Sequence, residues 1–113
     1  MKTDRELLQL AAKTIGLELE GDLYGNPGPW MPMYYQGKTY HPWNPLKDDG
    51  DALRLANELE LNIFHSRGNA YAMESESDQS DEQIVSHRNC KDKNEAMRRA
   101  IVRVAAEIGK AMT

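Results

Sequence analysis

Apolar residues recur at helical spacing in three segments of the chain, and each segment follows residues that can cap a helix. In the first segment, residues 4–15, the apolar side chains fall on one face, and Gly16 follows where a left-handed residue can end a helix. Thr3 and Glu6 have the spacing of a capping box, in which each side chain satisfies a backbone N–H of the first turn. The apolar stripe consists of Leu7, Leu8, Ala11 and Ile15. This pattern predicts an amphipathic helix over residues 4–15.

The two other helical segments have the same design. Asp48 or Asp49 can cap a helix over residues 51–61. The apolar stripe of this helix consists of Ala52, Leu55, Ala56 and Leu59. A longer helix over residues 93–112 begins with a second capping-box pair, Asp92 and Glu95. Its stripe consists of Met97, Ala100, Ile101, Val104, Ala105 and Ile108.

Strand patterns lie between these helices. Residues 17–25 alternate apolar and acidic side chains, and residues 33–41 form a second candidate strand with a turn at Gln36 and Gly37. Residues 62–73 and 84–90 are rich in β-favouring side chains, and Arg67 and Gly68 suggest a turn or bulge within the first of them. The acidic stretch 74–83 between them has no apolar residue and is typical of a solvated hairpin loop. Residues 26–32, "NPGPWMP", are irregular because proline removes backbone donors.

The order helix, strand region, helix, strand, strand, helix predicts an α+β fold. We expect a small antiparallel sheet, because residues 62–73 and 84–90 are joined by a hairpin loop. Three amphipathic helices each need an apolar surface to cover, so we expect the sheet to be sandwiched between helices in α/β/α layers. A length of 113 residues suits a single domain over residues 1–113.

Charge narrows the choice of partners. The net charge of −4 argues against a protein that coats DNA. The charge is uneven: residues 1–87 carry a net −8 and residues 88–113 a net +4, so only the C-terminal segment suits an anionic partner. The single cysteine, Cys90, excludes an intrachain disulfide. A charged N-terminus and the lack of a long apolar run favour a cytoplasmic protein without a membrane segment.

The helical segments also resemble a known family. "WNPLKDDGDALRLANELEL" (residues 43–61), "EAMRRAIVRVAAEIGKAM" (residues 95–112) and the N-terminal "LLQLAAK" resemble, in order, segments of the phage ABA sandwich domain family, which comprises small bacteriophage and prophage proteins. The resemblance covers nearly the whole chain. It implies a viral or prophage origin, a bacterial host cytoplasm and helix–sheet–helix layers. The family has no assigned biochemical activity, so the resemblance implies no catalytic residues and no cofactor.

Aromatic and methionine side chains gather in the irregular middle of the chain. Such residues dominate protein–protein contacts because they offer a large area at small entropic cost. The candidate contact residues are Trp30, Met31, Met33, Tyr34, Tyr35 and Trp43. Two interpretations remain open: these residues bind a protein of the host or phage, or they close the core of a small domain. Trp43, between Pro42 and Pro45, favours packing over the sheet and the end of the middle helix. A homodimer could also bury this surface.

The aromatic residues favour a non-catalytic protein that binds another protein, and the resemblance implies a phage accessory protein that modulates a host process or defence. The acidic stretch 74–82 would attract a basic partner. The alternative is nucleic-acid or nucleotide binding through Arg98, Arg99 and Arg103 on the last helix. A solvated cationic face explains the same residues, and no phosphate loop or recognition-helix motif accompanies them.

Metal and nucleophile chemistry are weaker hypotheses. His87 and Cys90 have the spacing of half a zinc site, but His41 and His65 stand apart in sequence and a closed site needs four ligands. Nothing in the sequence marks an acid or oxyanion site for Cys90 as a nucleophile. The acidic cluster 48–51 lacks the ligand spacing of a calcium loop and suits helix capping. We therefore expect no metal and no enzyme activity.

Overall fold

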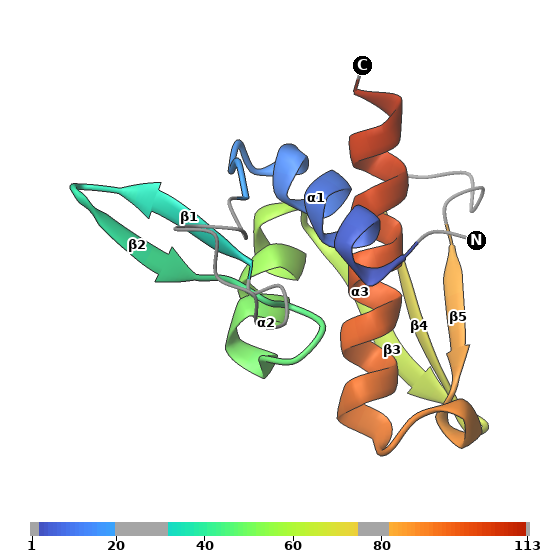
Figure 1. Ribbon diagram of the computed structural model, residues 1–113. Coiled ribbons are helices and arrows are strands. Elements are labelled where there is room, and N and C mark those ends of the chain that lie inside the picture. The colour runs from blue at the N-terminus through green and yellow to red at the C-terminus, as the bar shows by residue number, and fades with distance from the viewer. Residues whose placement is uncertain (1–2, 20–31, 75–81, 113) are drawn as a thin grey trace.

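The computed structural model describes residues 3–19, 32–74 and 82–112, shown in Figure 1. The elements in chain order are α1 (Asp4–Thr14), β1 (Met33–Gln36), β2 (Thr39–Pro42), α2 (Asp49–Glu58), β3 (Leu61–Ser66), β4 (Asn69–Glu74), β5 (Gln83–Ser86), the short 3-10 helix η2 (His87–Asn89) and α3 (Lys93–Ala111). The α+β class and the predicted order of helices and strand regions are confirmed. The strands form two small antiparallel sheets packed against the helices.

All three helices begin at the capping residues that the sequence indicates. In each, the side chain of the capping residue accepts a hydrogen bond from the backbone N–H three positions later, which satisfies a donor left free at the helix start. The pairs are Thr3 with Glu6 at 3.1 Å, Asp48 with Asp51 at 2.8 Å, and Asp92 with Glu95 at 2.8 Å. The middle helix begins and ends slightly earlier than predicted, at residues 49–58.

The long helix α3 is buried on two sides. One side follows the predicted stripe, with Ala100, Ile101 and Val104 packed toward the sheet and α2. The other side packs against α1, at Gly109 and the residues one and two turns before it. Together the buried residues are Ala96, Ala100, Ile101, Val102, Val104, Ala105, Ala106 and Gly109. The predicted stripe covers the first side and Ala105 of the second, and it leaves out Val102, Ala106 and Gly109.

The three-stranded sheet has the order β3-β4-β5, and all its strands are antiparallel. Ala70 and Ala72 of β4 have no exposed surface, because α3 lies against these small side chains. Arg67 and Gly68 form the two-residue turn between β3 and β4 with φ of 52° and 81°, as a tight hairpin of this length requires. The turn that the sequence suggested here is therefore confirmed. It divides the predicted strand 62–73 into two.

A second hairpin, β1 and β2, extends away from the helices (Figure 1). Its two-residue turn is formed by Gly37 and Lys38, whose φ angles of 61° and 75° match the right-handed twist of the strands. The predicted strand region 33–41 is thus a complete hairpin, and its turn lies one residue later than the predicted Gln36 and Gly37. Within the predicted strand 17–25, residues 17–19 are not part of a strand, and residues 20–25 lie outside the described residues.

The structure refines the predicted layers. In Figure 1, α1 crosses in front of α3, and the three-stranded sheet lies on the other side of α3. Alternate residues of the strands point away from α3, and on this face Phe64 and Ile84 are 44% and 51% exposed. We call this surface, with Phe64, Tyr71 and Ile84 at its centre, the open face of the sheet. On the opposite face α3 packs against all three strands, and α2 packs against β3.

We expect Gly109→Ala to lower the free energy of unfolding by about 3 kcal/mol, because an added Cβ overlaps the backbone carbonyl oxygen of Leu10 and must push α1 away from α3. Chemical denaturation measures the loss. Gly50→Ala is the comparison variant, because its Cβ meets side-chain atoms of Arg54 and Asp48 at 3.2 Å or more, rather than a backbone atom. Equal stability of Gly109→Ala and the wild type would contradict the close packing of α1 on α3.

Candidate binding site

The segment from Pro42 to Leu46 joins the β1–β2 hairpin to α2 and is held by hydrogen bonds from both sides. The Trp43 backbone N–H donates to the Pro32 carbonyl at 3.0 Å, which ties the two ends of the hairpin together. The Asn44 N–H donates to Asp51 Oδ2 at 2.9 Å, which ties the segment to α2. Trp43 is only 6% exposed and belongs to the core. Trp43 is therefore packed in the core, as one of the two interpretations expected, and its side chain is not an exposed contact.

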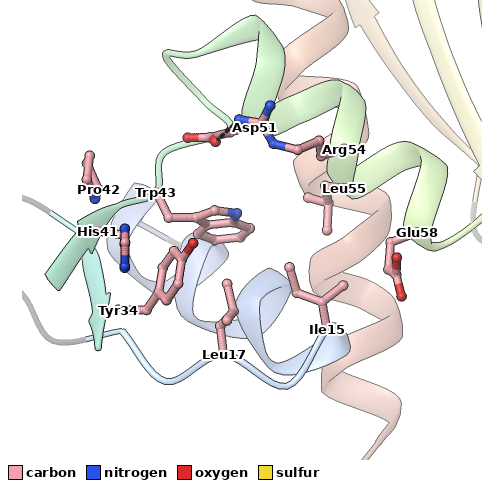
Figure 2. A pocket seen from close by; sticks show the side chains of 10 residues that line it. All are labelled: Ile15, Leu17, Tyr34, His41, Pro42, Trp43, Asp51, Arg54, Leu55 and Glu58. Carbon is pink, nitrogen blue, oxygen red and sulfur yellow. Dashed lines mark hydrogen bonds and ion pairs between the residues drawn. The ribbon is translucent and has the colours of Figure 1, made fainter. Parts of the chain in front are cut away.

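A cleft of about 500 Å³ lies beside Trp43, between the hairpin, the end of α1 and one side of α2. Figure 2 shows its lining side chains, which are Ile15, Leu17, Tyr34, His41, Pro42, Trp43, Asp51, Arg54, Leu55 and Glu58. Segments distant in sequence meet here because Trp43 packs between the hairpin and the two helices. This is the candidate site for binding a ligand or a partner.

One wall of the cleft is aromatic. The rings of Tyr34 and His41, opposite each other in the hairpin, stack with centroids 5.2 Å apart and an interplanar angle of 26°. Thr39 Oγ1 lies 3.0 Å from His41 Nε2 and fixes the orientation of the imidazole ring. The facing wall is aliphatic, with Ile15 and Leu55. Such a lining suits an apolar or aromatic side chain of a partner.

The rim of the cleft carries both signs of charge. Arg54 donates to Asp51 Oδ1 at 2.6 Å, and this hydrogen bond raises the pKa of the Arg54 guanidinium. Asp51 is therefore engaged twice, by Arg54 and by the Asn44 N–H, which is the role of a structural carboxylate. Arg54 keeps 72% of its side chain exposed at the rim, with Glu58 one turn further along α2. The rim can contact polar or charged groups beside an apolar side chain in the cleft.

The structure brings some of the predicted contact residues together. Tyr34 and Trp43 line the cleft. Met33 lies at the base of the hairpin, and Tyr35 points to the other side of it, where it is 56% exposed and packs on Tyr40 at 4.9 Å between ring centroids. Trp30 and Met31 lie outside the described residues. Sequence reasoning missed Arg54 and Glu58, because their place at the rim depends on where Trp43 packs.

The three arginines of the alternative hypothesis do not form one exposed cluster. Arg98 has 16% of its side chain exposed; its Nε donates to the Leu46 carbonyl at 2.9 Å and its Nη1 to Asp49 at 2.6 Å. Arg99 pairs with Asp4 at 3.1 Å. Arg103 is partly buried. A phosphate contact by Arg98 or Arg99 would have to break these bonds.

Two histidines far apart in sequence lie side by side. His65 Nδ1 and His87 Nε2 are 2.9 Å apart, because β3 ends where η2 begins across the sheet. Partial burial lowers the pKa of His65 below its ordinary value of 6.5, and the charges of His87 and Lys93 lower it further. Among the described residues, no group of three or more His, Cys, Asp or Glu side chains is arranged to hold a metal ion. Cys90 follows η2 as a free thiol.

The acidic residues before and within α2 have structural partners. Asp48 caps the helix, and Asp49 pairs with Arg98. This agrees with the capping interpretation of the cluster 48–51. No helix in the described ranges 3–19, 32–74 and 82–112 has the length and apolar character to cross a membrane.

Comparison of the chain with models of protein families, with curated proteins and with solved structures found no match. The fold and the cleft define a small α+β protein with a candidate binding site beside an exposed hairpin. The resemblance to the phage family stays a prediction.

We expect Arg98→Ala to lower the free energy of unfolding by about 2 kcal/mol, because it removes two charge-assisted hydrogen bonds from a side chain with little exposure. Thermal or urea denaturation measures this loss. Arg103→Ala serves as the control on the same helix. If Arg98→Ala leaves stability unchanged but weakens binding to an oligonucleotide, the structural role of Arg98 is wrong and the nucleic-acid alternative gains support.

The His65 pKa predicts how stability depends on pH. The folded protein lowers the pKa of His65, so protonation of His65 favours the unfolded state. The stability linked to neutral His65 is fully present above pH 6.5 and is lost as the pH falls through the folded-state pKa. We expect the loss of stability between about pH 7.5 and about pH 5 to be smaller in His65→Gln than in the wild type. Urea denaturation at both pH values, with His41→Gln as control, measures the difference. An identical pH dependence for His65→Gln and wild type would refute it.

Proposed function

We propose that this protein is a non-catalytic protein-binding module whose contact surface is the β1–β2 hairpin and the cleft beside it. The main observation in support is that an exposed aromatic hairpin borders a cleft with aromatic and aliphatic walls and a charged rim. The side chain of Tyr35 is 56% exposed, so it does not serve to close the core. Trp43, beneath the hairpin, already does so. An apolar side chain of a partner could enter the cleft while the hairpin packs against the surrounding surface.

The charges at the rim support binding rather than catalysis. Asp51 is held by Arg54 and by a backbone N–H, which leaves its oxygens poorly placed to transfer a proton. Arg54 retains free guanidinium surface for a carboxylate or a backbone carbonyl of the partner. Contact sites of this kind commonly place a few aromatic residues and an arginine around one pocket.

The phage resemblance extends the proposal to a biological setting. It supports a protein of phage or prophage origin, acting in the cytoplasm of a bacterial host on a host or phage protein. A role in modulating a host process or defence belongs to the same proposal. It rests on the sequence segments 43–61 and 95–112, which form α2 and α3 with the coil before α2.

We expect Tyr35→Ala and Arg54→Ala each to reduce the amount of captured partner at least about tenfold, since one such residue contributes about 2 kcal/mol at a protein contact. Affinity capture from a bacterial lysate, quantified by mass spectrometry, measures this. Leu53→Ala is the matched control, because Leu53 is 53% exposed on α2 and does not line the cleft.

A photo-crosslinking amino acid at position 35 should join the same partner, whereas one at position 53 should not. Equal capture by Tyr35→Ala, Arg54→Ala and the wild type would show that the partner binds elsewhere. Recovery of nucleic acid in place of a protein, removed by nuclease treatment, would favour the alternative function instead.

A further inference from the structure

An apolar row crosses the open face of the three-stranded sheet. Phe64, Tyr71 and Ile84 are register partners on β3, β4 and β5, so their side chains project side by side from the same face. The rings of Phe64 and Tyr71 stack, with centroids 4.7 Å apart and an interplanar angle of 5°. Phe64 and Ile84 are 44% and 51% exposed. A row of three large apolar side chains on an open sheet is a typical contact surface.

Charges of opposite sign lie at the two ends of the same strands. Glu60 precedes β3 and Glu82 precedes β5, whereas Arg67 follows β3 and Arg88 lies in η2 after β5. Because β3 and β5 both pair antiparallel with β4, they run in the same direction. Both glutamates therefore lie at one end of the sheet and both arginines at the other. The apolar row crosses the sheet between these two ends, closer to Glu82 than to Arg88 on β5.

We propose that the open face binds the open face of a second copy of this chain. The two-fold axis lies between the two sheets, parallel to the apolar row and perpendicular to the strands. Rotation about this axis places each strand over its own copy with the direction reversed. The end with Arg67 and Arg88 then lies over the end with Glu60 and Glu82 of the second copy, and Arg67 and Glu60 are closest to being opposite each other. The apolar rows meet at the centre.

This charge pattern favours a second copy over other occupants. The face is self-complementary in charge, because both arginines lie at one end of the sheet and both glutamates at the other. A nucleic acid lying along the strands would meet Glu60 and Glu82 at one end and be repelled there. The acidic and basic ends also select one of the two ways in which the sheets can align, because the parallel alignment would bring like charges together.

The size of the face predicts a weak and reversible dimer. Three strands spaced about 4.8 Å apart, each with about five residues rising about 3.3 Å, give a footprint of a few hundred Å². Standard stable interfaces bury about 800 Å² on each partner, so this contact belongs to the weak class. The surface is separate from the hairpin and cleft, so dimerisation and partner binding can be tested independently.

The charge swap provides the sharpest test. One double variant, Arg67→Glu with Arg88→Glu, makes both ends of the sheet acidic; the other, Glu60→Lys with Glu82→Lys, makes both ends basic. Each variant alone should be monomeric in sedimentation velocity at a concentration where the wild type dimerises. An equimolar mixture should form a heterodimer, because an acidic end then faces a basic end at both places. Circular dichroism confirms that each variant is folded.

The apolar row is tested by Phe64→Ser and Ile84→Ser, which should each abolish the dimer. Leu53→Ser is the control, since Leu53 is equally exposed but lies on α2, away from the open face. A wild type that stays monomeric up to millimolar concentration would overturn the proposal. So would a mixture of the two charge variants that does not associate, or an equal loss of dimer in Leu53→Ser. Capture of the protein partner should be unchanged in all these variants.

Discussion

The contact between Gly109 of α3 and Leu10 of α1 fixes the distance between these two helices. Their backbones approach so closely there that a Cβ at position 109 cannot fit. Helices this close need small residues on the facing side, and α3 supplies Ala105 and Ala106 there. On its other side α3 rests on Ala70 and Ala72 of β4. A single helix is thus packed between α1 and the sheet. The core around it is completed by residues of α1, α2, the sheet and the coil that carries Trp43.

This arrangement determines which surfaces are left over. With α1 packed on α3 rather than on the sheet, the face with Phe64 and Ile84 remains exposed. With the core closed at one end by Trp43, the β1–β2 hairpin is free to extend from the body, and the cleft forms where hairpin and helices diverge. Both proposed contact surfaces therefore lie where the small core leaves a sheet face or a hairpin uncovered. The same chain can use each of them without disturbing the other.

The sequence predicted what depends on nearby residues. The three helix starts follow from capping side chains three residues from the backbone groups they satisfy, and the hairpin turns follow from Gly37 and Gly68. Of the second buried side of α3 it predicted only Ala105, because alanines satisfy many environments and one clear apolar stripe already explained the helix. The pair of His65 and His87 was also out of reach, since it depends on the register of strands separated by a loop.

Ion pairs within the fold join the positive C-terminal segment to the negative part of the chain. The sequence favours the positive C-terminal segment as the place for an anionic partner, but Arg98 and Arg99 are paired with Asp49 and Asp4 from the negative part of the chain. Each pair joins α3 to an element formed earlier in the sequence, so the charges help to place α1 and α2 against the central helix. Arg98 also serves the Leu46 carbonyl in the coil before α2, which extends this effect to the segment that carries Trp43. The contacts of Arg98 thus tie α3 to α2 and to the coil that carries Trp43, whose side chain lines the cleft.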